Sequence, residues 1–324
     1  MLSEAKHLLA KMPTLSFRPS EASGEILTHM IEIHNDTLKI TLHAPDGEKG
    51  YYRGTRFDWA GVFASIEHKG CNYAQEWFEG YSPVMHDAVC GPAEEFSPIG
   101  LDEVEAGEPF LKIGVGMLEK MEGEYDRFKL HNILNPGQRT LEITEDSITQ
   151  GHVLESDRGY AYGYFKTIAI TGEDSFRIGH KLVNKGSKTL KGDVYNHNFF
   201  TLGLLETGAS RQLDFPFKPE GDWRAEYSEV GFTDNGIRFT RTLKKGESVY
   251  TGNLHEAGKG LTGSPNGFTL IETQTGRGVK AICSEPMTKA VFWSYHLIAC
   301  IEPYVDFCIA PGETFEFDIE YTLY

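Results

Sequence analysis

The sequence has few cysteines, and their spacing fits neither a disulfide scaffold nor a zinc site. There are five in 324 residues, an odd number, and no two of them are separated by only two residues: Cys71, Cys90, Cys283, Cys300 and Cys308. A disulfide framework and a zinc site both require regular pairs, so neither is expected. Free thiols suit a reducing compartment, and we therefore expect a cytoplasmic protein that holds no metal.

The sequence also lacks a long apolar segment. No run approaches the roughly 20 apolar residues that a transmembrane helix needs. The first eleven residues carry Glu4 and Lys6 beside a short apolar core, and they do not follow the three-part pattern of a signal peptide. We expect no membrane partner, and we expect residues 1–24 to form a short amphipathic helix followed by a loop.

Positive charge is scarce. Lys and Arg number 31 against 47 Asp and Glu, which gives a formal net charge of −16. Such a surface argues against nucleic acid and anionic membranes as partners. The Gly-x-Gly from Gly114 to Gly116 lacks the third glycine and the βαβ context of a dinucleotide site. A neutral or weakly charged small molecule is the expected ligand, bound by a monomer or homodimer without a cofactor.

Aromatic residues, glycine and two-residue periodicity are abundant. The chain has 20 Phe, 15 Tyr and 35 Gly, which suits strands joined by tight turns. Apolar and polar residues alternate over 176–184 and again over 315–323, the pattern of half-buried strands. No repeat of fixed period and no low-complexity linker interrupts the chain. Residues 25–324 are therefore predicted to form one all-β domain, a large antiparallel β-sandwich.

Two stretches carry side chains suited to acid–base chemistry. The first is Val194 to Phe200, a strand whose end places His197 among aromatic residues. An imidazole titrates near neutral pH, although the same pattern also fits a core-edge histidine satisfied by a backbone carbonyl. The second is Ala299 to Tyr304, where Glu302 precedes Pro303 at an expected strand end. Apolar neighbours there are expected to raise the pKa of Glu302 by desolvation.

The order of these two stretches resembles the aldose 1-epimerase (galactose mutarotase-like) superfamily. The chain reads His-Asn-Phe-Phe from His197, where that family has His-Pro-Tyr-Phe with an acid histidine. It reads Glu-Pro-Tyr from Glu302, where common members have Glu-Thr-Gln with a base glutamate before a final Pro-Gly-Glu strand. The resemblance spans roughly residues 55–324 and implies a β-supersandwich.

The resemblance also implies the reaction, which is interconversion of sugar anomers. Glu302 would accept the proton of the anomeric hydroxyl, and His197, as imidazolium, would protonate the ring oxygen. The ligand would be a monosaccharide or sugar derivative, and the chemistry requires no metal or cofactor. Two alternatives stay open on the same fold: a non-catalytic carbohydrate-binding protein, and a lyase or hydrolase acting on modified sugars.

Two charged residues are matched to sugar-binding roles. Arg56, with Arg53 as the substitute, corresponds to an arginine that contacts the sugar ring in the resembled family; the alternative is a structural pair between Arg56 and Asp58. The family often has a second histidine near residues 91–100, which here form an expected loop without one. Glu95 would accept hydrogen bonds from sugar hydroxyls in its place, and the alternative is a solvated acidic loop.

Three further residues are weaker candidates for sugar binding. Lys112 lies in a strand of small residues and would either reach a ligand or carry a charge at a barrel edge. His152 is a candidate for the second histidine. Tyr162 is the middle of three tyrosines spaced two apart, from Tyr160 to Tyr164, which share one strand face. They would form a wall for a sugar ring, or they lie on the outer face of the protein.

Overall fold

The computed structural model describes residues 30–324, which consist almost entirely of strands. Within these residues the one helical element is η1 (Leu101–Glu103), a single turn of 3-10 helix. The all-β class predicted from the sequence is therefore confirmed. The helix predicted within residues 1–24 lies outside the described residues. In the part that the structure describes, no helix is long and apolar enough to cross a membrane.

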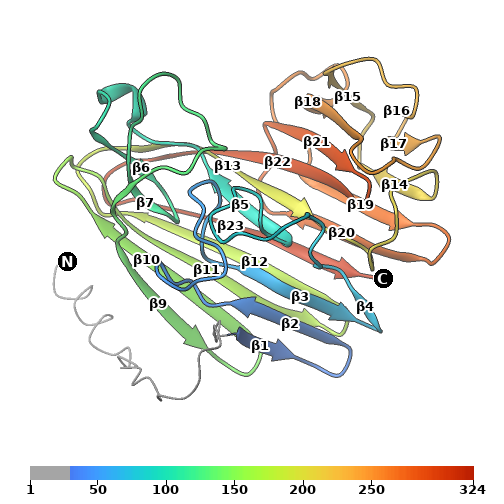
Figure 1. Cartoon of the computed structure of the whole chain (residues 1–324), viewed down its shortest axis with the longest axis horizontal. Helices are drawn as coiled ribbons and strands as arrows, with labels where there is room; N and C mark the ends of the chain where they lie inside the picture. The colour runs from blue at the N-terminus through green and yellow to red at the C-terminus, as the bar shows by residue number, and fades with distance from the viewer. Residues whose placement is uncertain (1–29) are drawn as a thin grey trace.

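A ten-stranded antiparallel sheet forms one layer (Figure 1). Two of its central strands coincide with the two clearest alternating segments of the sequence, and in both, buried and less buried residues alternate along the strand. The strands lie in the order β16 (Val230–Phe232), β17 (Gly236–Phe239), β14 (Arg211–Asp214), β19 (Gly267–Glu272), β20 (Arg277–Cys283), β23 (Thr314–Leu323), β12 (Ser175–Asn184), β11 (Ala161–Gly172), β10 (Ser147–Glu155), β9 (Gln138–Ile143).

A six-stranded antiparallel sheet forms the second layer. Its strands lie in the order β15 (Pro219–Trp223), β18 (Ser248–Glu256), β21 (Lys289–Tyr295), β22 (Ile298–Ile309), β13 (Leu190–Phe199), β5 (Gly91–Phe96). All six residues of β5 are buried, so the loop predicted over residues 91–100 is wrong for its first six positions. Side chains of β13 and β22 are buried on both faces near the middle of the sheet.

Two small sheets complete the structure. One contains β1 (Met30–His34), β2 (Leu38–His43), β3 (Val62–His68) and β4 (Cys71–Asn72). In Figure 1 it lies in front of the lower part of the ten-stranded sheet. The other contains β6 (Pro109–Lys112), β7 (Gly116–Glu119) and β8 (Ile133–Asn135). The loop between β7 and β8 supplies residues to the site described below.

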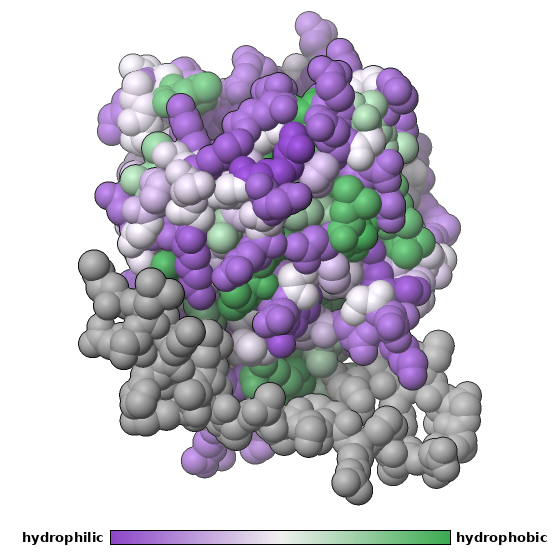
Figure 2. Space-filling view, turned by 90° about the vertical axis from the view of Figure 1, so that its left-hand side faces the viewer, coloured by the Kyte–Doolittle hydropathy of each residue, from purple (hydrophilic) through white to green (hydrophobic). Residues whose placement is uncertain are grey.

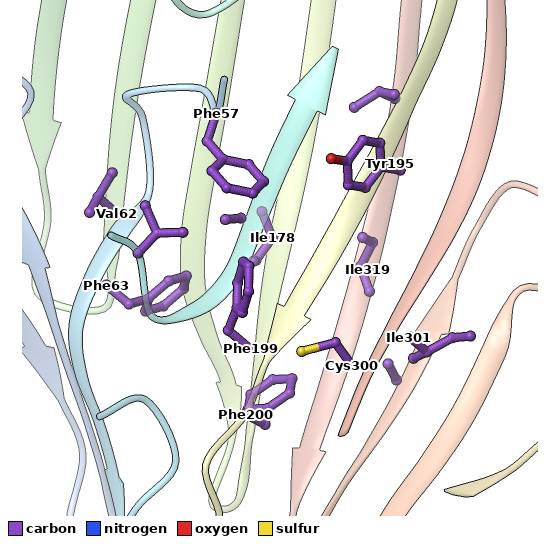
Figure 3. Packing of buried hydrophobic residues seen from close by; sticks show 14 of the residues in the cluster. Phe57, Val62, Phe63, Ile178, Tyr195, Phe199, Phe200, Cys300, Ile301 and Ile319 are labelled. Atoms are coloured by element: carbon purple, nitrogen blue, oxygen red, sulfur yellow. The ribbon is translucent and has the colours of Figure 1, made fainter. Parts of the chain in front are cut away.

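The described residues share one hydrophobic core, which extends from Ile31 near its start to Leu323 near its end. Aromatic rings fill the space between the layers; the ring centroids of Phe200 and Tyr321, for example, lie 5.6 Å apart. Figure 3 shows Phe63, Phe199 and Phe200 among the buried apolar side chains. Offset and edge contacts of this kind add stability beyond the area they bury. The outer surface is mainly hydrophilic on the face shown in Figure 2, with scattered apolar patches.

Pro303 lies in the middle of β22, and the prediction that it marks a strand end is wrong. β21 pairs with β22 past this point, with Ala290 opposite Pro303. On the other side, the ladder between β13 and β22 runs only as far as Tyr195 opposite Tyr304. Proline has no N–H to continue that ladder. The side-chain amide of Asn198 takes over, donating to the carbonyl of Ile301 at 2.8 Å.

Candidate active site

His197 and Glu302 face each other across two neighbouring strands of the six-stranded sheet. The register that pairs Tyr195 with Tyr304 places them opposite each other two residues further along, on the same face. Nε2 of His197 lies 3.2 Å from Oε1 of Glu302. The two residues are only 3% and 6% exposed, so the pair is almost completely removed from water.

Aromatic rings surround the imidazole of His197. Phe199, two residues along the same strand, stacks on it with ring centroids 3.6 Å apart and planes within 8°. Phe57 and Trp293 meet its edges at 5.9 and 6.0 Å. Figure 3 shows Phe57 and Phe199 close together, and their ring centroids are 5.8 Å apart. The packing restricts the orientation of the imidazole and shields it from solvent.

One ring nitrogen of His197 is left without a hydrogen bond. Among the described residues no group accepts from or donates to Nδ1, and Nε2 faces Glu302. The alternative of a core histidine satisfied by a backbone carbonyl is therefore wrong. Buried polar atoms nearly always have a partner, and exceptions call for an explanation such as a catalytic role or a bound ligand.

Burial places the proton of this pair on the carboxyl group. It raises the pKa of Glu302 to about 8, against the opposing charge of Arg56. Burial, assisted by the positive charges of Arg56 and Arg127, lowers the pKa of His197 well below its usual value. The rise for Glu302 has the predicted direction. The imidazolium form assigned to His197 is a correction: at neutral pH a neutral imidazole lies beside a protonated carboxyl group.

Glu95 is the centre of a buried ionic cluster next to this pair. One carboxylate oxygen accepts from Nζ of Lys112 at 2.9 Å. The other accepts from Nε of Arg56 at 2.9 Å, from the hydroxyl of Tyr195, and from Nη1 of Arg127 at 3.5 Å. Glu95 is 2% exposed, so the alternative of a solvated acidic loop is wrong. Both of its oxygens are occupied by side chains of the protein.

The cations around Glu95 decide its ionisation. Burial alone would raise its pKa, but the charges of Lys112, Arg56 and Arg127 outweigh that effect and lower the pKa to about 2. Lys112 has no exposed surface, so it neither carries a charge at an edge nor lies open to a ligand. Its role in the structure is to hold Glu95.

Arg56 joins this cluster to the histidine–glutamate pair. Its Nη2 donates to the hydroxyl of Tyr195 at 2.9 Å, and its guanidinium lies 4.5 Å from the centre of the Phe57 ring and 5.1 Å from that of Phe128. Stacking between two rings and bonding to Glu95 hold the guanidinium in one orientation.

The alternative partner proposed for Arg56, Asp58, is engaged elsewhere. Its carboxylate lies 2.7 Å from the buried ammonium of Lys166. Lys166 also pairs with Glu94, which faces the interior between the two layers. The prediction of a structural Arg56–Asp58 pair is therefore wrong.

His152 and Tyr162 lie on the ten-stranded sheet, and the structure does not bring them to His197. The hydroxyl of Tyr162 is 2.8 Å from Nδ1 of His152, whose Nε2 is 2.8 Å from the carbonyl of Pro136. Both side chains are fully buried, as are their neighbours Tyr160 and Tyr164. The tyrosines form neither an open wall for a sugar nor an outer surface; they pack in the core.

A different histidine lies near the outer edge of the site. His86 packs edge-on against Phe128 at 5.0 Å, and Phe128 in turn covers Arg56. The side chain of His86 is 34% exposed. His86 belongs to no recognisable sequence motif. Only the folded structure shows that it lies at this site.

Sequence patterns missed two more members of the cluster. Tyr195 precedes His197 by two residues on β13, and the two-residue period of a strand was sufficient to place both on one face. Arg127 lies in the β7–β8 loop, where nothing in the sequence distinguishes it from other surface arginines. As for metal ions, residues 30–324 contain no group of three or more His, Cys, Asp or Glu side chains placed to hold one.

Comparisons with known proteins identify the fold. No family model and no curated protein sequence matches the chain. Solved structures do match. A galactose mutarotase related enzyme from Lactobacillus acidophilus has a TM-score of 0.54 at 13% identity, covering 91% of this chain and 97% of its own. A galactose mutarotase-like protein from Clostridium acetobutylicum has 0.54 at 13%, covering 91% and 94%.

An aldose epimerase homologue from C. elegans is similar over a comparable length. Its TM-score is 0.53 at 15% identity, covering 94% of this chain and 99% of its own. At these identities the likeness concerns the fold, and it confirms the architecture expected from the order of the two motifs. The chain therefore has the fold of the galactose mutarotase-like proteins.

Proposed function

We propose that this protein is an aldose 1-epimerase-like isomerase that interconverts the anomers of a small sugar. One observation carries the proposal: the buried contact, at 3.2 Å, between His197 and Glu302. A neutral imidazole beside a protonated carboxyl group is a ready base and a ready acid, and each contributes roughly 10²–10⁴ in rate.

The contact distance suits this reaction because the anomeric oxygen and the ring oxygen are bonded to the same carbon. His197 takes the proton of the anomeric hydroxyl while Glu302 gives its proton to the ring oxygen. The ring opens to the aldehyde, the adjacent carbon–carbon bond rotates, and the ring closes with the opposite anomer. Closure returns both protons, so the pair ends in its starting state.

These roles are the reverse of those that the family resemblance implies, but the proton count is the same. The pair holds one proton in either case, on Glu302 as a neutral pair or on His197 as an ion pair. Burial disfavours the ion pair, because both charges would lose their hydration. The reaction passes through the ion pair after the first transfer, beside the guanidinium of Arg56.

A sugar reaches the pair only when covering side chains move, since His197 and Glu302 are nearly inaccessible. Phe128 is 55% exposed and contacts Arg56 from the outside. The side chain of Arg127 is 38% exposed and lies 5.7 Å above the ring of Tyr195. Both belong to the β7–β8 loop, so displacement of this loop is the entry step. Arg56 then donates to sugar hydroxyls.

The hydrolase and carbohydrate-binding alternatives receive less support. A glycoside hydrolase needs a second carboxylate as nucleophile or base. The nearest candidate, Glu95, has both oxygens occupied by cations and a tyrosine. A carbohydrate-binding protein needs an exposed groove of aromatic side chains, and the aromatic residues around His197 are packed against one another.

The test is exchange between α and β anomer signals, measured by NMR for a panel of free and modified sugars. We expect the wild-type protein to accelerate exchange of at least one sugar and His197→Asn to abolish most of that acceleration. His34→Asn is the matched control, because His34 lies exposed on β1. Binding of a sugar by the wild type without any acceleration would replace this proposal by the carbohydrate-binding alternative.

A further inference from the structure

The cluster around Glu95 contains more positive than negative charge. Three cations, Arg56, Lys112 and Arg127, lie within 3.5 Å of one carboxylate. Two of them are buried, with side-chain exposures of 8% for Arg56 and none for Lys112. The surplus of two positive charges stands out in a chain whose net charge is −16. Buried cations are normally balanced by carboxylates or by a ligand.

The carboxylates of the neighbouring strands β13 and β22 reduce this surplus without removing it. Asp193 and Asp306 lie opposite each other on β13 and β22, with Lys289 close by on β21 as a third charge. Counted together with the cluster, these residues still leave one positive charge in excess. Glu302 faces His197, and its raised pKa keeps it protonated, so it adds no negative charge at neutral pH. At the outer edge of the site, Asp126 pairs with Lys129, and Asp87 lies 3.7 Å from His86.

We propose that the substrate is an anionic monosaccharide, one that carries a carboxylate or a phosphate group, and that Arg127 with Arg56 binds this group. The proposal rests on the function proposed above for the position of the sugar ring. It revises the expectation of a neutral or weakly charged ligand. Sequence patterns gave no cluster of Arg and Lys because these three cations come from separate segments of the chain.

Arg127 is the member best placed to meet the anionic group. Its side chain is 38% exposed, whereas the other two cations are covered. It is bound by Nη1 to Glu95 and to the hydroxyl of Tyr195, at 3.5 and 3.3 Å, and these long contacts hold it weakly. A guanidinium binds carboxylates and phosphates through two parallel hydrogen bonds, with a geometry that a neutral hydroxyl cannot match.

The position of Arg127 also couples binding to entry. The β7–β8 loop carries both Arg127 and Phe128, and Phe128 covers Arg56. An anionic group that draws Arg127 away from Glu95 moves the adjacent ring as well. Arg56 is then uncovered beside the histidine–glutamate pair, where the sugar ring must lie.

The test compares three sugars that share one configuration: the neutral hexose, the hexuronate and the hexose 6-phosphate. The comparison is made once in the gluco series and once in the galacto series. Calorimetry measures their affinities for the wild type, for Arg127→Ala and for Arg158→Ala. Arg158 is the matched control, because it is also partly exposed and bound to one carboxylate, Glu108, at 3.5 Å.

We expect at least one acidic sugar to bind the wild type roughly tenfold or more tightly than its neutral parent, the range of a charged hydrogen bond. Arg127→Ala should abolish this preference, and Arg158→Ala should retain it. The hexuronate and phosphate samples distinguish the two sources of negative charge. Equal affinities for acidic and neutral sugars, or no binding of any acidic sugar, would overturn the proposal.

Two further readouts separate the possible failures. Raising the salt concentration from about 50 to about 500 mM should weaken the binding of acidic sugars and leave that of neutral sugars unchanged, because salt screens charges. This comparison needs no variant. Anomer exchange is followed in the same samples. Preference for acidic sugars without exchange supports the anionic site and contradicts the isomerase; exchange of neutral hexoses without such a preference does the reverse.

Discussion

Replacing Glu95 by glutamine tests the ionic cluster most severely. Glutamine keeps the size of the side chain but removes the one carboxylate of residues 30–324 that pairs with Arg56, Lys112 and Arg127. Two buried cations then lack a counter-charge, and removing one partner of a buried ion pair costs about 3–5 kcal/mol. The lowered pKa gives a second figure: a shift from 4.5 to about 2 corresponds to about 3 kcal/mol at pH 7.

The sign of the pH dependence follows from the direction of that shift. The folded-state pKa of Glu95 is lowered, so its stabilisation is present above pH 4.5 and is lost as the pH falls toward about 2. Urea unfolding followed by tryptophan fluorescence should give a loss of about 3 kcal/mol for Glu95→Gln at pH 7, with an unchanged m value. The difference from wild type should shrink below pH 4.5.

Two comparisons sharpen this experiment. The double variant Glu95→Gln with Lys112→Met removes one unpaired cation and should recover part of the loss. Glu67→Gln is the control, since Glu67 pairs with Lys39 on the surface and is 48% exposed; its loss should stay below about 1 kcal/mol. A loss below about 1 kcal/mol for Glu95→Gln at pH 7 would refute the reasoning, because such a value is typical of an exposed pair.

Three further predictions concern the reaction, the strands and the thiols. Anomer exchange should decline above about pH 8 as Glu302 loses its proton. Arg56→Gln should move this decline to higher pH, because Arg56 stabilises the carboxylate form of Glu302. If the midpoint of the pH–rate profile does not move in this variant, these roles are wrong. Asn198→Leu should lower the free energy of unfolding in urea by about 1–3 kcal/mol, because the carbonyl of Ile301 loses its hydrogen-bond donor. Unchanged stability would show that this hydrogen bond is dispensable. All five cysteines are free, so alkylation of the denatured, unreduced protein should modify five thiols by mass spectrometry, and a smaller number would reveal a disulfide.

The sequence predicted the strands well where one face of a strand meets the core. The alternation over 176–184 and 315–323 became β12 and β23, which pair with each other in the ten-stranded sheet. A period of two is a direct consequence of strand geometry, so it survives folding unchanged. The buried strand β5 was missed because it carries Pro92 and two adjacent glutamates, residues that are typical of loops.

His197 and Glu302 were predicted from the order of two motifs in the sequence, not from geometry. Their contact depends on the register between β13 and β22, which cannot be read from the sequence. Pro303 suggested a strand end because proline cannot donate to a ladder. The structure instead keeps the strand continuous and replaces one ladder bond by the side chain of Asn198.

Electrostatic surroundings were the least predictable part. Asp58, Glu94 and Glu95 all had several possible cations within the chain, and only the fold decides that Lys166 takes the first two. The surplus of positive charge arises because segments around residues 56, 112 and 127 meet at one carboxylate. The formal net charge of −16 is a sum over the whole sequence, so it does not reveal this local excess of positive charge.

Glu302→Gln tests the central claim most directly. Glutamine preserves the shape of the side chain but cannot hand a proton to the ring oxygen, so calorimetry should find sugar binding retained. Anomer exchange by NMR should fall roughly 10²-fold or more, about 3 kcal/mol of transition-state stabilisation. Glu313→Gln, in an exposed turn before β23, should exchange anomers as fast as wild type. If Glu302→Gln also exchanges anomers at the wild-type rate, Glu302 is not the catalytic acid and the proposed isomerase mechanism is wrong.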